Sequence, residues 1–152
     1  MVAAVKQPYQ GDIFDILTTE LDGLVADGYS ALSSVVLDPA SNAELLRDIE
    51  LSIGAQASNR TDGTVAVYAV PSIDGTNYVD WDTGTATNSA NEQYFIGSFT
   101  VNTGELVAAK AASFFSSPWG GKVKLAVRNQ TGVAFAATGN TVKGRRHGFA
   151  SQ

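Results

Sequence analysis

Oxygen-bearing side chains are concentrated in one short segment of the chain. Asp74, Asn77, Asp80 and Asp82 stand within nine positions of each other, and carboxylate and amide oxygens of this kind can hold Ca²⁺. The spacing does not match an EF-hand loop, because the Gly and Glu that such a loop requires at later positions are absent. We therefore expect these side chains to form and cap turns, with cation binding as the alternative.

Side chains that could act as nucleophiles, acid–base groups or metal ligands are few or scattered. His147 is the only histidine, and the chain contains no cysteine, which excludes disulfides, thiolate zinc sites and cysteine nucleophiles. Without a second histidine or a nearby carboxylate, His147 supports neither a catalytic triad nor a histidine metal site. The glutamates are scattered, so no carboxylate pair suits glycoside hydrolysis. The sequence predicts a protein that is not an enzyme and needs no cofactor.

Four aromatic residues could present flat ring faces to a sugar. They are Tyr78, Trp81, Tyr94 and Trp119. Aromatic residues in strands belong more often to a core, because burying one ring removes a large apolar area from water. We expect core positions for these rings, with a carbohydrate-binding platform as the alternative.

Large apolar residues near the N-terminus are candidates for contact with a partner protein. Residues 1–17 show no persistent period but contain Val5, Tyr9, Ile13 and Phe14. In a solvated tail these large apolar side chains would stay exposed to water, which is unfavourable. We therefore expect an extended arm that orders on a partner or a neighbouring subunit, with these residues as its anchors; a frayed terminus is the alternative.

A basic group near the C-terminus is the second candidate contact. Lys143, Arg145 and Arg146 precede His147 in a chain whose formal net charge is −5. Charges at the rim of an interface steer association and fix its register more than they add affinity. We expect this group to meet an acidic partner surface, with a solvated tail as the alternative.

The elements that position these residues are predicted to be mostly strands. Residues 64–70 are apolar at both alternate sets of positions, which predicts a strand in the middle of a sheet that is covered on both faces. Two further segments alternate apolar with polar residues, which predicts half-buried antiparallel strands. Their core-facing residues are Ile49, Leu51 and Ile53 in one segment and Val123, Leu125 and Val127 in the other. In the second segment Lys122, Lys124 and Arg128 should face outward.

One short helix is expected before the strands begin. Leu17, Leu21 and Leu24 stand at helical spacing, with a threonine available as the N-cap and Gly28 as a stop, which predicts a helix over residues 19–27. Turn signals along the chain predict about eight short strands in total. The fold class is mainly β: an antiparallel two-sheet β-sandwich, jelly-roll-like, with an N-terminal arm and a short helix. Residues 1–47 would hold the arm and helix, and residues 48–152 the sandwich domain.

The composition limits the partners. Only 16% of the 152 residues are charged and the net charge is negative, so we expect no nucleic-acid binding, which rests on phosphate neutralisation by Lys and Arg. The N-terminal sequence has too short an apolar run for a signal peptide, and no later window is long enough to span a bilayer. We expect no membrane association, and a protein made and used in a cytosol or in a particle assembled there.

Three stretches of the chain resemble a family of tailed-bacteriophage virion proteins, small products generally associated with capsid genes. They are TTELDGLVADGYSALSS at 18–34, VAVYAVPSIDGTNYVDW at 65–81 and SPWGGKVKLAVRNQTGVAFAATGNTVKGRR at 117–146. The resemblance covers most of the chain from Thr18 onward. Its motifs are structural rather than chemical, so it transfers no catalytic residues.

The resemblance implies a phage structural protein and, by analogy of fold, a β-sandwich decoration or cement protein that carries an N-terminal arm. The partner would be the major capsid protein, bound on the capsid exterior of the virion, and the protein would be a homo-oligomer, with a trimer favoured. The apolar anchors and the basic group described above would then contact the capsid. The alternatives are a head–tail connection or tail structural component, and a carbohydrate-binding module for host adsorption.

Overall fold

The computed structural model describes residues 6–38, 45–56, 62–85, 89–103, 108–113 and 121–151. Within these ranges the chain is mainly β, as the sequence predicts. The strands are β1 (Lys6–Leu17), β2 (Leu45–Ile53), β3 (Gly63–Ser72), β4 (Phe95–Val101), β5 (Ala108–Ser113), β6 (Lys122–Gln130) and β7 (Thr141–Ser151). The helical elements are the 3-10 turn η1 (Thr19–Leu21) and the short helix α2 (Ser89–Glu92).

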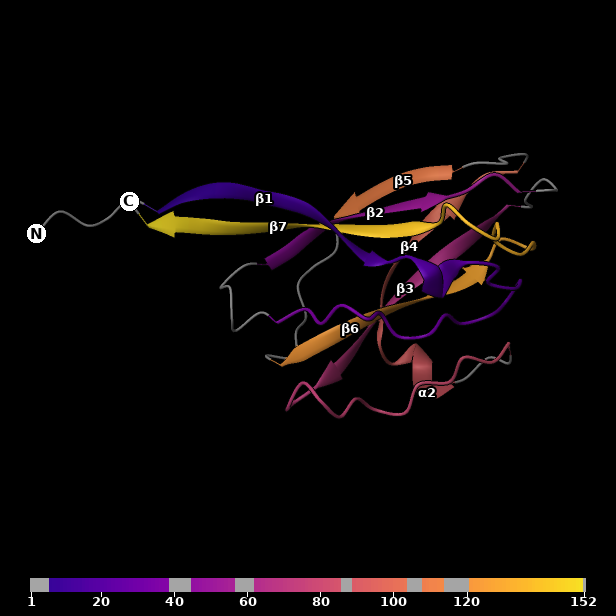
Figure 1. The fold of residues 1–152 in the computed structure, drawn as a ribbon, viewed down its shortest axis with the longest axis horizontal. Coiled ribbons are helices and arrows are strands. Elements are labelled where there is room, and N and C mark those ends of the chain that lie inside the picture. Colours follow the sequence, from indigo (N-terminus) through magenta and orange to yellow (C-terminus); the bar gives the residue numbers. More distant parts are fainter. Residues whose placement is uncertain are drawn as a thin grey trace, which may run out of the picture.

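The strands lie in two antiparallel sheets (Figure 1). Within the described ranges, one sheet has the order β1-β7-β2-β5 and the other the order β4-β3-β6. The pairing is nested, because β3 pairs with β4, β2 with β5 and β1 with β7. The chain therefore folds back on itself about the connection between β3 and β4, and its first strand lies beside its last.

The outer edge of β6 is covered by residues 27–37, which run antiparallel to it. The backbone N–H groups of Leu125 and Val127 donate to the hydroxyls of Ser33 and Ser30, at 3.1 and 3.0 Å. These hydroxyls take the place of the carbonyl acceptors that a regular strand would supply. The same segment also forms two β-bridges, Tyr29 with Arg128 and Leu37 with Val123. The pairing of residues 27–37 with β6 therefore lies inside that of β1 with β7 and outside that of β2 with β5.

The two sheets pack against each other around one apolar core. From β3, Val65, Val67 and Ala69 point into this core. On the opposite face of the strand, Ala66 and Tyr68 are also buried and belong to a second apolar cluster. This arrangement confirms the prediction that residues 64–70 form a central strand that is covered on both faces.

The predicted core positions of the two half-buried strands are confirmed. All six side chains lie in the core cluster: Ile49, Leu51, Ile53, Val123, Leu125 and Val127. One outward-facing residue differs from expectation, because Arg128 is only 9% exposed. The ring of Tyr29 and the carboxylate of Glu92 lie against its guanidinium group, so the outer face of this sheet carries a further layer of chain.

The predicted helix over residues 19–27 is wrong beyond its first turn. Only Thr19–Leu21 form a 3-10 turn. Gly23 and Asp27 have φ angles of 66° and 61°, in the left-handed region that a right-handed helix does not contain. The N–H of Gly23 donates instead to the carbonyl of Ala136 at 2.9 Å. Packing of this segment against the loop after β6 is therefore favoured over continuation of the helix.

The predicted N-terminal arm is not confirmed as a separate segment, because residues 6–17 form β1 and pair along β7. Ile16 and Leu17 are buried in the core. The alternation of this strand is hidden in the sequence by two register shifts, one between Gln10 and Ile13 and one before Leu17. Each extra residue on a strand moves the following side chains to the opposite face.

Candidate functional site

β1 and β7 form a two-stranded ribbon that unites the two groups of candidate partner-binding residues. Figure 1 shows these strands running out together beyond the other strands. The antiparallel register places Tyr9 opposite Gly148, Ile13 opposite Arg145, Phe14 opposite Gly144 and Asp15 opposite Lys143. Val5 lies outside the described residues. Strand pairing thus brings the apolar group from one end of the sequence beside the basic group from the other end.

Neighbouring apolar residues of β1 face in different directions. The Ile13 side chain is 55% exposed, whereas Phe14 is partly buried and packs against the core cluster. Consecutive residues of a strand point to opposite faces of the sheet. Of these two predicted anchors, Ile13 is therefore available to a partner and Phe14 contributes to the fold.

Lys143 of β7 lies between carboxylates on both neighbouring strands, and Arg145 lies beside a carboxylate on one of them. Lys143 is opposite Asp15 of β1 and Glu50 of β2, and Arg145 is opposite Asp48 of β2. Cross-strand pairs of opposite charge contribute roughly 0.2–1 kcal/mol each. The surface is therefore a pattern of alternating charge rather than a uniformly basic patch. The sequence interpretation missed these carboxylates because they come from strands that are distant in the chain.

Both neighbours of β7 bulge at the same level. β1 has one extra residue opposite Arg146. β2 has one extra residue between Leu46, which pairs with Arg146, and Asp48, which pairs with Arg145. Bulges bend a strand and increase its local twist. β2 pairs with β7 only as far as His147, whereas β1 follows β7 to Ser151. Within the described ranges, the ribbon beyond this level is therefore only two strands wide.

A pocket of about 180 Å³ lies at the base of the ribbon. Its lining is Ile13, Asp48, Ile49, Glu50, Lys143, Gly144 and Arg145. Apolar side chains and charges of both signs thus meet in one recess.

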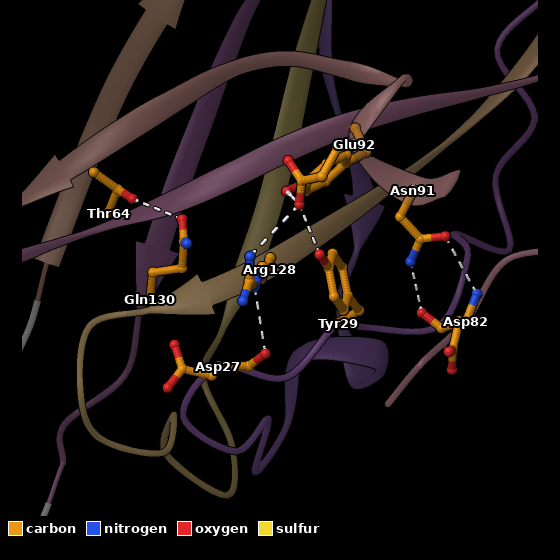
Figure 2. Close-up of polar contacts among 9 residues, drawn as sticks. Asp27, Tyr29, Thr64, Asp82, Asn91, Glu92, Arg128 and Gln130 are labelled. Atoms are coloured by element: carbon orange, nitrogen blue, oxygen red, sulfur yellow. Dashed lines mark hydrogen bonds and ion pairs between the residues drawn. The ribbon is translucent and has the colours of Figure 1, made fainter. Parts of the chain in front are cut away.

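A second cluster, polar and aromatic, lies on the opposite face of β3 from the core (Figure 2). The hydroxyls of Tyr29 and Tyr68 donate to the same oxygen, Glu92 Oε1, at 2.7 and 3.0 Å. Arg128 Nη1 lies 3.5 Å from that oxygen. Burial, and then the hydrogen bond to Glu92, raises the pKa of the Tyr68 hydroxyl well above its usual range. The cluster therefore joins three segments of the fold through one carboxylate oxygen.

Trp81 belongs to this cluster and does not form an open platform for a sugar. Its ring lies 5.6 and 5.4 Å from the centroids of two tyrosine rings, and its indole N–H donates to the carbonyl of Ser30 at 2.8 Å. The ammonium nitrogen of Lys124 lies over the Tyr78 ring, 4.8 Å from the ring centroid. Trp119 lies outside the described residues. Tyr94 packs against the same cluster, so each of the three predicted rings that the structure describes makes contacts within the chain.

Asp74 and Asp82 cap turns, as the sequence predicts. The Asp74 carboxylate accepts from the backbone N–H groups of Thr76 and Asn77, each at 2.8 Å, and from the Asn77 side-chain amide at 2.7 Å. These hydrogen bonds hold the pKa of Asp74 well below its usual range, and the bond from the Asn77 backbone has the largest effect. Asp82 Oδ1 accepts from the N–H of Gly84 at 2.9 Å. In the described part of the chain, no group of three or more His, Cys, Asp or Glu residues is placed to hold a metal ion.

Comparison of the chain with protein-family models finds no matching family, and comparison with curated proteins finds no match. Among the described residues, no helix has the length and apolar character needed to cross a membrane. The β1–β7 ribbon and the pocket at its base are the candidate functional site, because exposed apolar and charged residues converge there from separate strands.

Proposed function

We propose that this protein is a cement or decoration protein of a tailed-bacteriophage capsid, which binds the assembled major capsid protein lattice and stabilises the head. It acts on the capsid exterior of the virion as a homo-oligomer, with a trimer favoured. The observation that carries the proposal is the β1–β7 ribbon, which extends past the end of β2 and brings together the described members of both groups of candidate contact residues: Tyr9, Ile13, Phe14, Lys143, Arg145 and Arg146. A net acidic protein suits the exterior, where it does not meet the packaged DNA.

The nested strand pairing supports a jelly-roll-like β-sandwich. When residues 27–37 are counted as a strand, the described chain has eight strands: the first pairs with the eighth, the second with the seventh, the third with the sixth and the fourth with the fifth. Viral capsid and lectin domains use double-sheet jelly rolls of this kind. Fold alone does not fix function, but this architecture agrees with the virion role that the resemblance implies.

The ribbon is better suited to binding than a free arm would be. Each backbone residue of a free arm that becomes fixed on a partner costs roughly 1–2 kcal/mol of conformational entropy. Pairing with β7 has already ordered β1, so less of the binding free energy is lost on association. Burial of one exposed aliphatic side chain then contributes about 1.5–3 kcal/mol. Several ribbons in one oligomer would raise avidity on the order of a hundredfold or more if they engage together.

A protein that binds only the assembled lattice stabilises that lattice by mass action. The full chain is therefore mixed with assembled capsids of the phage that encodes it and, separately, with unassembled capsid protein, and binding is measured by cosedimentation. We expect saturable binding to the assembled capsids alone. Tyr9→Asp, in the part of the ribbon beyond β2, should weaken binding about tenfold or more, equivalent to about 1.4 kcal/mol. Val36→Asp, on the segment that covers β6, is the matched control and should bind normally.

The expected consequence in the virion is a lower temperature of DNA release from particles that lack the protein. Cryo-electron microscopy of intact virions gives the location directly. Location in the tail, with unchanged capsid stability, would contradict the cement role and favour the tail or head–tail alternative. Normal capsid binding by a folded Tyr9→Asp protein would contradict the ribbon as the contact element.

A further inference from the structure

An isoleucine that is fully exposed to solvent stands on an ordered loop at the end of β3. The residue is Ile73. The Asp74 carboxylate accepts from two backbone N–H groups of this loop, and the N–H of Gly75 donates to the Ser72 hydroxyl at 2.9 Å. The side chain of Lys122 packs directly against Gly75, where a Cβ atom would clash with it. A residue whose backbone is already ordered loses less entropy when it binds, so Ile73 is positioned like an anchor for a partner.

Ile73 borders a hollow of about 680 Å³ that offers mainly apolar atoms. Pro71 and Val79 line it together with Ile73, and Val79 is itself 39% exposed. The polar groups of the lining are engaged within the loop, because the Ser72 hydroxyl donates to Asp74 at 3.0 Å and both oxygens of Asp74 act as acceptors. Contiguous exposed apolar residues mark contact sites. The hollow therefore suits an aliphatic or aromatic side chain of a protein better than a sugar or a cation.

The hollow lies on the end of the sandwich from which the ribbon projects. Figure 1 shows β3 ending on the side towards which the ribbon runs. A short stretch of sequence connects the two places. Leu37 pairs with Val123, which also pairs with Pro71 beside the hollow. Eight positions later, Leu45 pairs with His147, at the level where β2 stops and the ribbon continues. A partner that lies along the ribbon is therefore brought to the end of the sandwich that holds the hollow.

The projecting part of the ribbon is too small to form a specific interface by itself. From the level where β2 stops, it consists of five residue pairs, from Gln10 with His147 to Lys6 with Ser151. Specific protein–protein interfaces use about 20–30 residues on each side and bury roughly 800 Å² per partner. A partner that binds the ribbon must therefore also contact neighbouring surface, and Ile73 with its hollow is an exposed apolar feature of that surface. This argument makes the partner of the ribbon the occupant of the hollow.

We propose that Ile73 and the hollow beside it form a second contact with the capsid protein that the ribbon binds. Ile73 packs between apolar side chains of the capsid protein, and an aliphatic or aromatic side chain of that protein enters the hollow against Pro71 and Val79. The inference rests on the proposed capsid binding, whereas the ribbon contact does not depend on this second contact.

The first test measures whether capsids shield position 73. Ile73→Cys carries the only thiol of the chain, because the natural sequence has no cysteine. Its labelling by a maleimide is followed with the protein free and with the protein fully bound to an excess of assembled capsids, and the label is read on this protein after denaturing electrophoresis. Because anchor residues are desolvated in an interface, we expect labelling to slow about tenfold or more on capsids. The control Val25→Cys, at a 51% exposed position near the far end of β6, should be labelled at the same rate in both states.

Each other result of this test counts against the inference. Equal labelling of free and bound Ile73→Cys overturns the second contact but leaves capsid binding, and hence the proposed function, intact. Slow labelling of the free protein that becomes faster on dilution would show that another copy of the chain covers Ile73, which also overturns the inference. If the natural protein does not bind capsids, the inference fails together with the proposed function.

The second test measures what the contact contributes to binding. Ile73→Asp places a charge against apolar atoms and should weaken cosedimentation with assembled capsids about tenfold, equivalent to about 1.4 kcal/mol. Ile73→Leu keeps an aliphatic side chain and should bind nearly as tightly as the natural protein, and Val25→Asp is the matched control that should bind normally. Urea denaturation should show all three variants folded with nearly natural stability, because the substituted positions are exposed. Natural capsid binding by Ile73→Asp, alongside weakened binding by Tyr9→Asp, overturns the second contact and keeps the ribbon contact.

Discussion

At the scale of single residues, Glu92 joins three separate parts of the chain. Its Oε1 atom accepts hydrogen bonds from Tyr29, in the segment that covers β6, and from Tyr68 of β3, and it lies near Arg128 of β6 (Figure 2). Both tyrosines are at most 2% exposed, and buried hydroxyls need partners. The Glu92 side chain itself is 40% exposed, so the cluster is satisfied without the cost of a fully buried carboxylate.

Replacement of Glu92 should destabilise the fold in proportion to the acceptors that are lost. Glu92→Ala leaves two buried phenols without this acceptor and should cost about 1–3 kcal/mol. Glu92→Gln keeps a carbonyl oxygen and should cost less. The free energy of unfolding is measured by urea denaturation, with Ser98→Ala, an exposed position on β4, expected within about 0.5 kcal/mol. Equal stability of Glu92→Ala and this control would show that the cluster does not hold the outer layer.

At the scale of elements, the chain treats the edges of its sheets differently. The outer edge of β6 is covered by residues 27–37, whose serine hydroxyls accept from its backbone N–H groups. Among the described strands, β1 forms an edge of its sheet without such a cover, but Pro8 and two register shifts interrupt it. Proline and bulges are the usual means of preventing uncontrolled strand addition at an edge. The ribbon is therefore suited to contacts through side chains rather than through its backbone.

Ser33 tests the cover over β6. Ser33→Ala removes the acceptor of the Leu125 N–H in a buried position, and we expect a loss of about 1–3 kcal/mol in the free energy of unfolding. Hydrogen exchange should also show faster exchange of the Leu125 amide than in the natural protein. Ser34→Ala, at the exposed neighbouring position, is the matched control. Unchanged protection of Leu125 in Ser33→Ala would contradict the hydroxyl as its acceptor.

At the scale of the whole molecule, nested pairing makes the N-terminal strand part of the fold. β1 supplies Ile16 and Leu17 to the core, while its earlier residues extend with β7 beyond β2. The two halves of this strand therefore differ, because the second half stabilises the protein and the first half projects beyond the end of β2. β1 and β7 together carry a small net positive charge, whereas the rest of the chain is net acidic.

Two truncations should separate these roles. Deletion of residues 1–17 removes two buried aliphatic side chains, each worth roughly 2–5 kcal/mol when lost, and should unfold the protein or strongly lower its melting temperature. Deletion of residues 1–9 removes only the projecting part of β1 and should leave cooperative unfolding nearly unchanged. Calorimetry compares the two with the full chain. Natural stability after deletion of residues 1–17 would contradict the place of β1 in the core.

The sequence by itself determined which face of the regular strands is buried, because alternation of apolar and polar residues is a local property that survives in any arrangement of strands. Val65, Val67 and Leu125 follow this rule, and the absence of cysteine and the turn-capping role of Asp74 were equally readable. Only the tertiary structure decided the partner of β1, since two bulges hide its period and β7 lies at the other end of the chain. The same distant pairing placed acidic residues beside Lys143 and Arg145 and buried Arg128 under a layer of chain. Contacts between residues far apart in sequence leave no local pattern, so the site could be predicted as two groups of residues but not as one surface.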